Sequence, residues 1–312
     1  MERLLAYLDE CRAEVNRALA EALPKADLPP STLHEAMRYS ALGAGKRLRP
    51  AIAFMCGEIF RPGHAEIKHA ACALEMAHCY SLIHDDLPAM DNDDLRRGRL
   101  TCHKAYNEAT AILAGDALLT LAFETVAKHY QPSLAVSIIS TMGHALGHSG
   151  MIGGQMMDLE GEHAVLAPEA VEDMYARKTG MLIAAACRVG AVINGGEGLQ
   201  LEQVEKYGRL IGLLFQLTDD KLDATATSEQ LGKTPGKDAA AGKCTLMRAY
   251  AALLQPGRDA KDKGAETAPT AAEMVEKRAQ EIATAAKTEL RSFGAEALMP
   301  RLLVDYILAR KK

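Results

Sequence analysis

The sequence contains no tryptophan, and aromatic residues make up only 4% of its 312 residues. Alanine and leucine fill most apolar positions instead, and both residues favour helix over strand. Alternating strand patterns are scarce, and the one short β-branched run, at 136–139, lies between helical stretches. These shortages argue against a β-rich fold and predict an all-α protein.

Disulfide and zinc frameworks are also missing. The seven cysteines are scattered and none forms a C-x-x-C pair, which argues against zinc binding and thioredoxin-like chemistry. An odd, scattered set of cysteines is typical of reduced thiols in the cytosol. The N-terminal segment is too charged for a signal peptide, and we therefore expect a cytoplasmic protein.

Signals for membranes and nucleic acids are absent too. No apolar run is expected to reach membrane-spanning length. The formal net charge of −5 disfavours bulk binding of nucleic acid. With 48% hydrophobic and 25% charged residues, the composition is that of a soluble globular protein. Any anionic substrate must therefore be held by a local cluster of cations.

Helical periodicity recurs along most of the chain. The pattern predicts helices over 65–86, 168–194, 200–223 and 270–292, and loops over 160–168, 194–199, 224–238 and 255–269. The last loop is rich in charge, Gly and Pro, and we expect it to be mobile. Because there is no internal repeat and no linker, residues 1–312 are predicted to form a single domain, a large helical bundle with short connections.

Two acidic clusters stand out, and the second follows helical spacing. Asp219, Asp220 and Asp223 fall within an arc of about 100° on a helix. Gln216 lies one turn earlier beside them, whereas Lys221 points away. Carboxylates stacked on one face destabilise a bare helix, so a solvated acidic face is the alternative interpretation. The apolar residues before the cluster favour burial instead, and buried carboxylates need a cation.

The first cluster starts with Asp85 and Asp86 and continues to Asp91. Asp91 follows Asp85 by six residues, which takes it off the face that Asp85 occupies in a straight helix. Pro88 breaks the helix, so the extra residues can loop out and let Asp85 and Asp91 share a metal. Oxygen-only ligands suit Mg²⁺, particularly when phosphates and water complete its coordination.

Basic residues form a matching set. Residues 43–50 read GAGKRLRP, in which the glycines allow an anion to approach backbone N–H groups. This is not a Walker A loop, because Arg47 replaces the Ser or Thr after the lysine. His78 lies two turns before Asp85 on the same helix face, where it can bind a phosphate or simply pack as a core residue. Further cations are Arg96, Arg97, Lys178, Lys233, Lys237 and Lys243.

Seven segments together resemble the trans (E)-prenyl diphosphate synthases over nearly the whole chain. They are GAGKRLRP, HCYSLIHDDLPAMDNDDLRRG, ATAILAGDAL, GGQMMDLEGE, RKTG, FQLTDDKLD and LGKTPGKD. The long first acidic motif is similar to that of bacterial farnesyl diphosphate synthases. The resemblance implies an all-α bundle of the isoprenoid synthase type with a central active-site cavity. It also implies a requirement for Mg²⁺, with Mn²⁺ as an alternative ion, and a homodimer, for which the alanine-rich helix faces offer a surface.

The resemblance assigns roles to the residues that match its motifs. Those expected to bind isopentenyl diphosphate are Lys46, Arg49, His78 and Arg97. Those expected to hold Mg²⁺ are Asp85, Asp86, Asp91, Asp219, Asp220 and Asp223. Those expected at the allylic diphosphate are Arg96, Lys178, Thr179, Gln216, Lys233 and Lys243. Of these, Lys178, Thr179 and Gln216 are the catalytic candidates, with Thr179 and Gln216 facing the developing carbocation.

The implied reaction condenses isopentenyl diphosphate with dimethylallyl and geranyl diphosphate to give (2E,6E)-farnesyl diphosphate by ionisation, condensation and elimination. Tyr80 is the fifth residue before the first motif, where an aromatic ring is associated in the family with a fifteen-carbon product. With Ser81 it would border the pocket for the growing chain. An ordinary core position is the alternative for Tyr80.

Other functions stay open at this stage. A geranyl or geranylgeranyl diphosphate synthase would carry the same motifs. A catalytically silent partner subunit is a different class, but such subunits typically lose aspartates that are present here. The segment GKRLRP and the second motif argue against a terpene cyclase. The segment DNDDLRRG lacks the glycine and the terminal glutamate that a calcium-binding loop requires. The chain departs from the family at Ala44, which replaces a usual glycine, and at Lys221, where an apolar residue is commoner.

Overall fold

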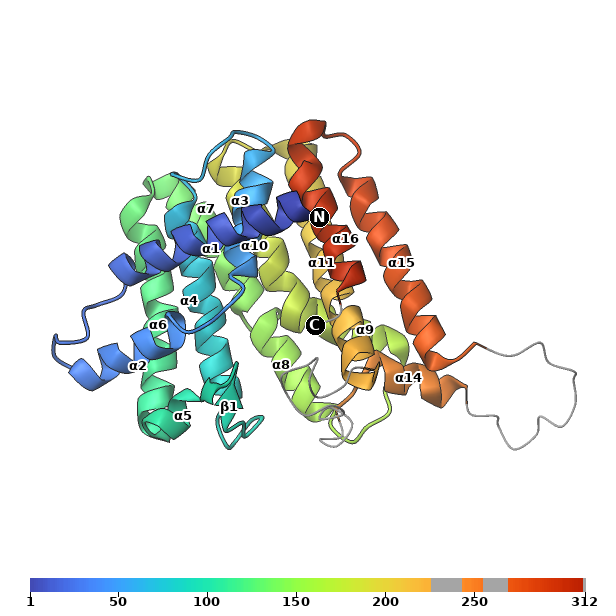
Figure 1. Ribbon diagram of the computed structural model, residues 1–312, viewed down its shortest axis with the longest axis horizontal. Helices are drawn as coiled ribbons and strands as arrows, with labels where there is room; N and C mark the ends of the chain where they lie inside the picture. Colours follow the sequence, from blue (N-terminus) through green and yellow to red (C-terminus); the bar gives the residue numbers. More distant parts are fainter. Residues whose placement is uncertain (226–242, 255–268, 311–312) are drawn as a thin grey trace, which may run out of the picture. The chain divides into compact units, whose positions relative to one another are not determined.

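The computed structural model describes residues 1–225, 243–254 and 269–310, and these are almost entirely helical (Figure 1). The all-α prediction is therefore confirmed. The helices are α1 (Glu2–Ala22), α2 (Ser31–Ala41), α3 (Leu48–Glu58), α4 (Lys68–Asp85), α5 (Cys102–Ala105), α6 (Glu108–His129), α7 (Pro132–Leu146), α8 (Met151–Glu160), α9 (Pro168–Tyr175), α10 (Met181–Ile193), α11 (Gly198–Thr225), α14 (Leu246–Leu253), α15 (Ala271–Glu289) and α16 (Leu298–Ala309). A π-helical turn, η1 (Ala176–Gly180), and a 3₁₀ turn, η2 (Ala295–Ala297), complete them.

The helices predicted from periodicity are confirmed as α4, as α9 with η1 and α10, as α11 and as α15. The β-branched run at 136–139 is helical and lies within α7, where Ile138 is fully buried, because packing overrides the weak strand preference of the run. The loops predicted at 160–168 and 194–199 also lie between helices. Most of the loops predicted at 224–238 and 255–269 lies outside the described residues, as does the mobility expected for the second.

The chain groups into two compact units. Unit 1 comprises Met1–Gly143, Ala185–Glu202 and Ala295–Pro300, and unit 2 comprises His144–Ala184, Gln203–Gly294 and Arg301–Lys312. Four helices, α7, α10, α11 and α16, contribute residues to both units. The single domain and the central cavity expected from the sequence concern how the units combine, and both stay predictions.

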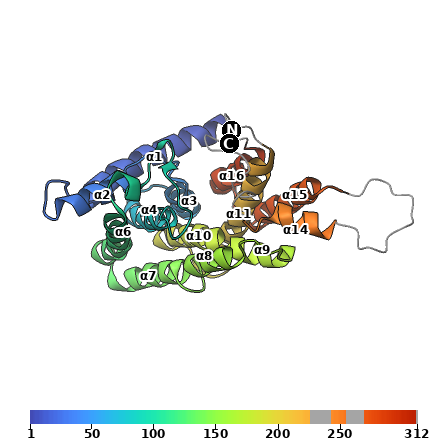
Figure 2. The same cartoon turned by 90° about the horizontal axis from the view of Figure 1, so that it is seen from below.

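Unit 1 is built around α4, which packs along α6 and also contacts α1, α2 and α3 (Figures 1 and 2). Eleven of its residues are buried, most of them small or apolar. Arg47 caps α3 from a left-handed backbone conformation and is itself buried. Its guanidinium forms an ion pair of 2.8 Å with Glu75 of α4 and donates to the carbonyl oxygens of Ala41 and Gly43. Arg47 therefore stabilises the fold of unit 1.

The described residues contain two short strands, which the sequence patterns did not predict. The short hairpin of β1 (Leu95–Arg96) and β2 (Arg99–Leu100) is antiparallel. Its two turn residues, Arg97 and Gly98, both have positive φ, of 54° and 75°. This is the backbone of a type I′ turn, which joins two-residue hairpin loops. The strands are too short and too polar to leave a strand pattern in the sequence.

Unit 2 is organised around the π-helical turn η1. A Cβ added at Gly154 of α8 would lie 2.3 Å from the backbone nitrogen of Lys178. A Cβ added at Gly212 of α11 would lie 2.5 Å from the Cα of Gly180. Both glycines thus let neighbouring helices approach η1 at backbone distance. Around them α9 contacts α8 and α14, and α14 contacts α15.

One described helix, α6, is long and apolar enough to cross a membrane by length and composition alone. Its most apolar stretch has a mean hydropathy of 1.5, and 39% of that stretch is buried. The expectation that no apolar run reaches this length was therefore too strict. Core helices pass the same test, and α6 packs along α4 and against α2 and α5, so the structure gives no clear membrane span.

The close packing of α3 against α10 yields a stability prediction. A Cβ added at Gly190 would lie 1.9 Å from the backbone oxygen of Ala53, so Gly190→Ala must push two helices apart. We expect the free energy of unfolding to fall by about 1–3 kcal/mol, measured by chemical denaturation. Gly143→Ala is the matched control, since a Cβ there meets no described atom within 4 Å and should stabilise α7 by about 0.5–1 kcal/mol. Equal effects of the two changes would contradict this account.

Candidate functional site

The first acidic cluster forms where α4 ends. The helix stops at Asp85, as the proline break predicts. The chain then folds back, and the backbone N–H of Asp91 donates to the carbonyl oxygen of Asp85 at 2.8 Å. A second backbone bond of 3.2 Å joins the N–H of Asp93 to the carbonyl of Asp86. The loop thus brings the backbone of Asp91 back to Asp85 after the helix break.

Arg96 of the hairpin lies among these carboxylates. Its Nε and Nη2 atoms bind Oδ1 of Asp86 at 2.8 and 2.6 Å, and Asp86 is only 3% exposed. Burial raises the pKa of Asp86, and Asp91 adds to the rise, against the lowering effect of Arg96. Burial would lower the pKa of Arg96, but pairing with Asp86 and the charges of Asp85 and Asp91 raise it instead. Arg96 therefore pairs with one carboxylate and lies within electrostatic range of two more.

The donor chemistry of this cluster fits a divalent metal. The described residues contain no group of three or more His, Cys, Asp or Glu side chains already gathered as a metal site. The carboxylates of Asp85, Asp86 and Asp91 nevertheless share one cation, Arg96, within electrostatic reach. A cluster of oxygen ligands that is completed by water and phosphate is the usual environment of Mg²⁺.

Several arginines surround His78 in the same unit. The Nε of Arg49 and the Nδ1 of His78 are both buried without a hydrogen-bond partner among the described residues. Burial and the neighbouring Arg49, Arg97, Arg96 and Arg47 hold the pKa of His78 well below its usual value. Burial also lowers the pKa of Arg49 to about 10. An imidazole with an unsatisfied buried Nδ1 beside several arginines suits the binding of an anion.

A cleft in unit 1 includes Arg96, Arg97 and Asp86 in its lining. Arg97 donates to the carbonyl oxygen of Ala44 at 2.6 Å, and a Cβ added at Gly45 would collide with its guanidinium. Lys46, the other predicted cation of this segment, is exposed. Gly45 thus makes room for the side chain of Arg97. The sequence had instead suggested that an anion approaches the backbone directly at this glycine.

Tyr80 and Ser81 lie on α4 just before the acidic cluster. Tyr80 is 5% exposed, and its hydroxyl is buried without a partner among the described residues. Its ring packs edge-to-face on His84, with ring centroids 5.7 Å apart. Burial and the charge of Asp85 raise the pKa of Tyr80 to about 12. The hydroxyl of Ser81 donates to the carbonyl oxygen of His78 in its own helix. The larger side chain before the acidic cluster is therefore that of Tyr80.

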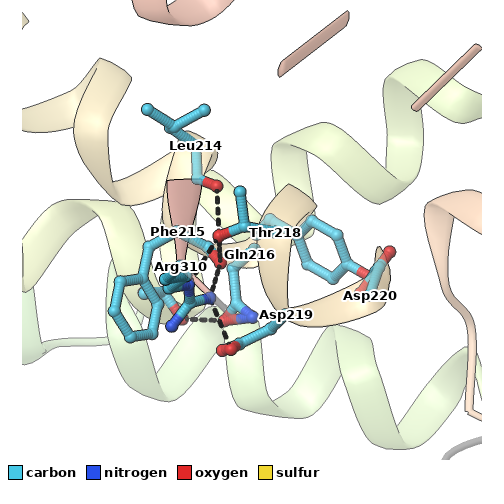
Figure 3. Close-up of polar contacts among 9 residues, drawn as sticks. Leu214, Phe215, Gln216, Thr218, Asp219, Asp220 and Arg310 are labelled. Carbon is cyan, nitrogen blue, oxygen red and sulfur yellow. Dashed lines mark hydrogen bonds and ion pairs between the residues drawn. The ribbon is translucent and has the colours of Figure 1, made fainter. Parts of the chain in front are cut away.

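The second cluster lies near the end of α11 and involves an arginine that the sequence analysis missed. Arg310, from the residues after α16, forms an ion pair with Asp219 (Figure 3). It also donates to the hydroxyl of Thr218 at 2.8 Å and to the carbonyl of Phe215 at 2.6 Å. The guanidinium stacks on the ring of Phe215, 3.8 Å from its centroid. A basic C-terminal end was visible in the sequence, but nothing there linked it to Asp219.

Asp220 and Asp219 have different surroundings. The hydroxyl of Tyr175 donates to both carboxylate oxygens of Asp220 at 2.8 Å, and the backbone N–H of Leu246 donates to one of them at 2.8 Å. Asp220 thereby connects α11 to α9 and to the start of α14.

Asp223 is 8% exposed, which agrees with the burial expected for this face. Lys221 points away, as predicted, and forms an ion pair with Glu276 of α15.

The catalytic candidates of unit 2 meet at η1. The hydroxyl of Thr179 donates to Oε1 of Gln216 at 2.5 Å, so the structure brings these two side chains together. Lys178 and Lys243 both bind Asp158 of α8, at 2.6 and 3.3 Å. Asp158 stands in the segment GGQMMDLEGE, and this position was the signal available for finding it. Lys233 and Lys237 lie outside the described residues.

Comparison with known proteins identifies the family. The family model described as polyprenyl synthetase matches residues 30–283. Farnesyl diphosphate synthase of Escherichia coli is 40% identical over 311 residues, which cover 98% of each chain. Chloroplastic geranylgeranyl pyrophosphate synthase of Capsicum annuum is 40% identical over 309 residues, which cover 97% of this chain and 78% of the relative.

A crystal structure of an FPP/GFPP synthase from Zymomonas mobilis superposes with a TM-score of 0.81 at 33% identity. The match covers 98% of this chain and 99% of that one. The family consists of all-α prenyltransferases of isoprenoid biosynthesis that use divalent metal ions. The family model matches most of the chain and relatives match over its full length, so the chain belongs to the polyprenyl synthetase family.

Proposed function

We propose that this prenyltransferase condenses isopentenyl diphosphate with dimethylallyl and then geranyl diphosphate to give (2E,6E)-farnesyl diphosphate. The observation that carries the proposal is the pair of opposite charge groups in unit 1. The buried, unpartnered nitrogen atoms of Arg49 and His78 suit a diphosphate. The carboxylates around Arg96, in the same unit, suit the metal of a second diphosphate.

The reaction begins with heterolysis of the allylic C–O bond. The electron pair leaves with the diphosphate, and an allylic cation remains. The double bond of isopentenyl diphosphate then attacks, forming a C–C bond and moving the positive charge to the adjacent carbon. Loss of one proton to the released diphosphate restores a double bond. This chemistry needs no side-chain base with a shifted pKa, but it needs a dry site in which water cannot capture the cation.

Each group of residues has a task in this reaction. Mg²⁺ held by the aspartates of a cluster would stabilise a leaving diphosphate as a Lewis acid. Fixed positive charge for such a diphosphate comes from Arg96 in unit 1 and from Lys178 and Lys243 in unit 2. The carbonyl of Gln216, held by the hydroxyl of Thr179, offers an electron-rich neighbour to the cation. Lys46, Arg49, His78 and Arg97 bind isopentenyl diphosphate in this proposal.

The first experiment tests the purified protein alone, with Mg²⁺ and both substrates, and identifies products by mass. Wild type should release prenyl diphosphates, whereas Asp85→Ala and Asp219→Ala should turn over at least about 100-fold more slowly, since several kcal/mol of charge stabilisation are lost. Glu276→Gln is the control, because it alters only the contacts of Glu276 with Lys221 and Gln280, neither of which is a predicted site residue. No product from the wild type would favour a silent partner subunit. Near-normal turnover of either aspartate variant would rule out its metal role.

Product length is the finer part of the proposal. Tyr80 is buried and its ring packs against His84, so it fills space on α4 directly before the metal cluster. Overpacking such a site with another isoprene unit costs about 1–3 kcal/mol, enough to stop elongation in most turnovers. The second candidate is a geranylgeranyl diphosphate synthase, which is favoured by relatives that carry this name.

Tyr80→Ala should shift the product from fifteen to twenty carbons, because the space of the ring becomes available to the chain. Tyr80→Phe is the matched control. It keeps the ring and removes a hydroxyl that has no described partner, so it should keep the fifteen-carbon product and unfold no more easily than wild type. Chromatography with mass detection reads both outcomes. Fifteen-carbon product from Tyr80→Ala at the wild-type rate would place the length stop elsewhere.

We also propose a homodimer located in the cytoplasm. The apolar helix α6 leaves two large hydrophobic side chains in solvent, with Ile112 44% and Leu113 57% exposed. Such a face is typical of a surface that another chain covers, and an isologous interface would bury both copies at once. All seven cysteines are buried free thiols, which agrees with a reducing compartment.

Leu113→Glu should convert the dimer to a monomer, because a two-fold interface would then bury two like charges close together. Light scattering at micromolar concentration measures the mass. Val165→Glu places the same charge at an exposed position of the loop before α9 and should leave the dimer intact. A monomeric wild type would refute the proposed assembly.

A further inference from the structure

Asp158 of α8 has an environment that its exposed neighbours on the helix lack. It is 5% exposed, although it is a carboxylate. Its Oδ2 atom accepts hydrogen bonds from the ammonium groups of both Lys178, at 2.6 Å, and Lys243, at 3.3 Å. Two ammonium groups that share one oxygen repel each other, so the carboxylate is what keeps the pair together. Burial would raise the pKa of Asp158, but the two lysines outweigh it and lower it.

The backbone positions Asp158 for this contact. Gly154, one turn earlier on the same face of α8, lets the helix touch the backbone of Lys178 in the π-helical turn. The side chain of Lys178 therefore starts beside α8, and its ammonium group reaches Asp158 one turn further on. A π turn inserted in a helix frequently marks a functional site.

Lys243 approaches Asp158 from a different part of unit 2. Its segment is anchored at Leu246, whose backbone N–H donates to Asp220 at 2.8 Å. The ammonium group of Lys243 also pairs with Glu162 at 3.3 Å. Thus two lysines from separate segments, each with its own backbone anchor, converge on a single buried oxygen.

We propose that Asp158 is a positioning residue that holds Lys178 and Lys243 together as a two-ammonium site for the diphosphate of the allylic substrate. This inference rests on the proposed function. Each ammonium group has three donors, so a lysine that binds Asp158 can also donate to a phosphate oxygen. Without Asp158 the two lysines would move apart, and binding would have to order both flexible side chains again.

A competing effect has the opposite sign. Asp158 is itself negative and repels a diphosphate, so a role as a mere counter-charge predicts tighter binding once the charge is removed. A positioning role predicts weaker binding. The direction of the change therefore separates the two roles, and a general structural role would impair both substrates alike.

The experiment titrates inorganic diphosphate into the full-length protein by calorimetry, with Mg²⁺ in excess. Asp158→Asn should raise the Kd at least about tenfold. Glu160→Gln removes an exposed carboxylate from the same helix and should stay within about twofold of wild type. Thermal unfolding checks that each variant is folded, and Asp158→Ser serves as a smaller neutral replacement if Asp158→Asn does not fold.

Two further readouts test that Asp158 acts through the lysines. In the Lys178→Ala/Lys243→Ala protein, adding Asp158→Asn should change the Kd by less than about twofold. In steady-state assays, Asp158→Asn should raise the KM for the allylic diphosphate and leave that for isopentenyl diphosphate within about twofold. Unchanged or tighter binding by Asp158→Asn, or an equal loss without the lysines, would overturn the proposal.

The titration does not depend on turnover, so the two proposals can fail separately. Weaker diphosphate binding by Asp158→Asn in a protein that forms no prenyl product would support the positioning role and reject the proposed function. Prenyl synthesis by the wild type, with diphosphate binding by Asp158→Asn unaltered, would support the proposed function and reject the positioning role. A wild-type protein that binds no diphosphate would overturn the positioning role.

Discussion

The chemistry of unit 2 depends on one packing constraint, the contact of the π-helical turn η1 with two helices at backbone distance. Gly154 of α8 and Gly212 of α11 leave no room for a Cβ beside this turn. The extra residue of a π turn changes the directions of the side chains in the turn, and here these include Lys178 and Thr179. The hydroxyl of Thr179 then meets Gln216 and the ammonium group of Lys178 meets Asp158. A residue larger than glycine at either contact would push its helix away from the turn that carries Lys178 and Thr179.

Three buried carboxylates among the described residues, Asp86, Asp158 and Asp220, each have one partner or several. Asp86 pairs with Arg96, Asp158 with two lysines, and Asp220 accepts from a tyrosine hydroxyl and a backbone N–H. Such pairing offsets the cost of removing a charge from water. The partners differ in kind, however. An arginine or lysine can turn toward a phosphate when one binds, whereas the N–H that holds Asp220 is part of a helix start. Asp220 therefore has a structural task besides the one expected from its motif.

The arginines of the segment GAGKRLRP show how neighbouring residues of one type divide their tasks. Arg47 satisfies its donors inside unit 1 and caps α3. Arg49, two residues later, keeps a buried Nε without a described partner next to the neutral imidazole of His78. A buried unsatisfied donor costs free energy unless a ligand completes it. Only the second arginine therefore presents unsatisfied hydrogen-bonding capacity to an anion.

The sequence by itself determined the all-α class, the main helix ranges, the helix break after Asp85 and the side of α11 on which Asp219, Asp220 and Asp223 lie. These features follow from local rules, namely helical periodicity, the effect of proline and the spacing of residues on one helix. The tertiary structure alone decided that Arg310 pairs with Asp219, that Arg47 pairs with Glu75 and that Asp158 joins Lys178 to Lys243. Each of these contacts joins residues far apart in the chain, and no local pattern encodes which buried carboxylate a distant cation will reach, because that choice depends on how the helices pack.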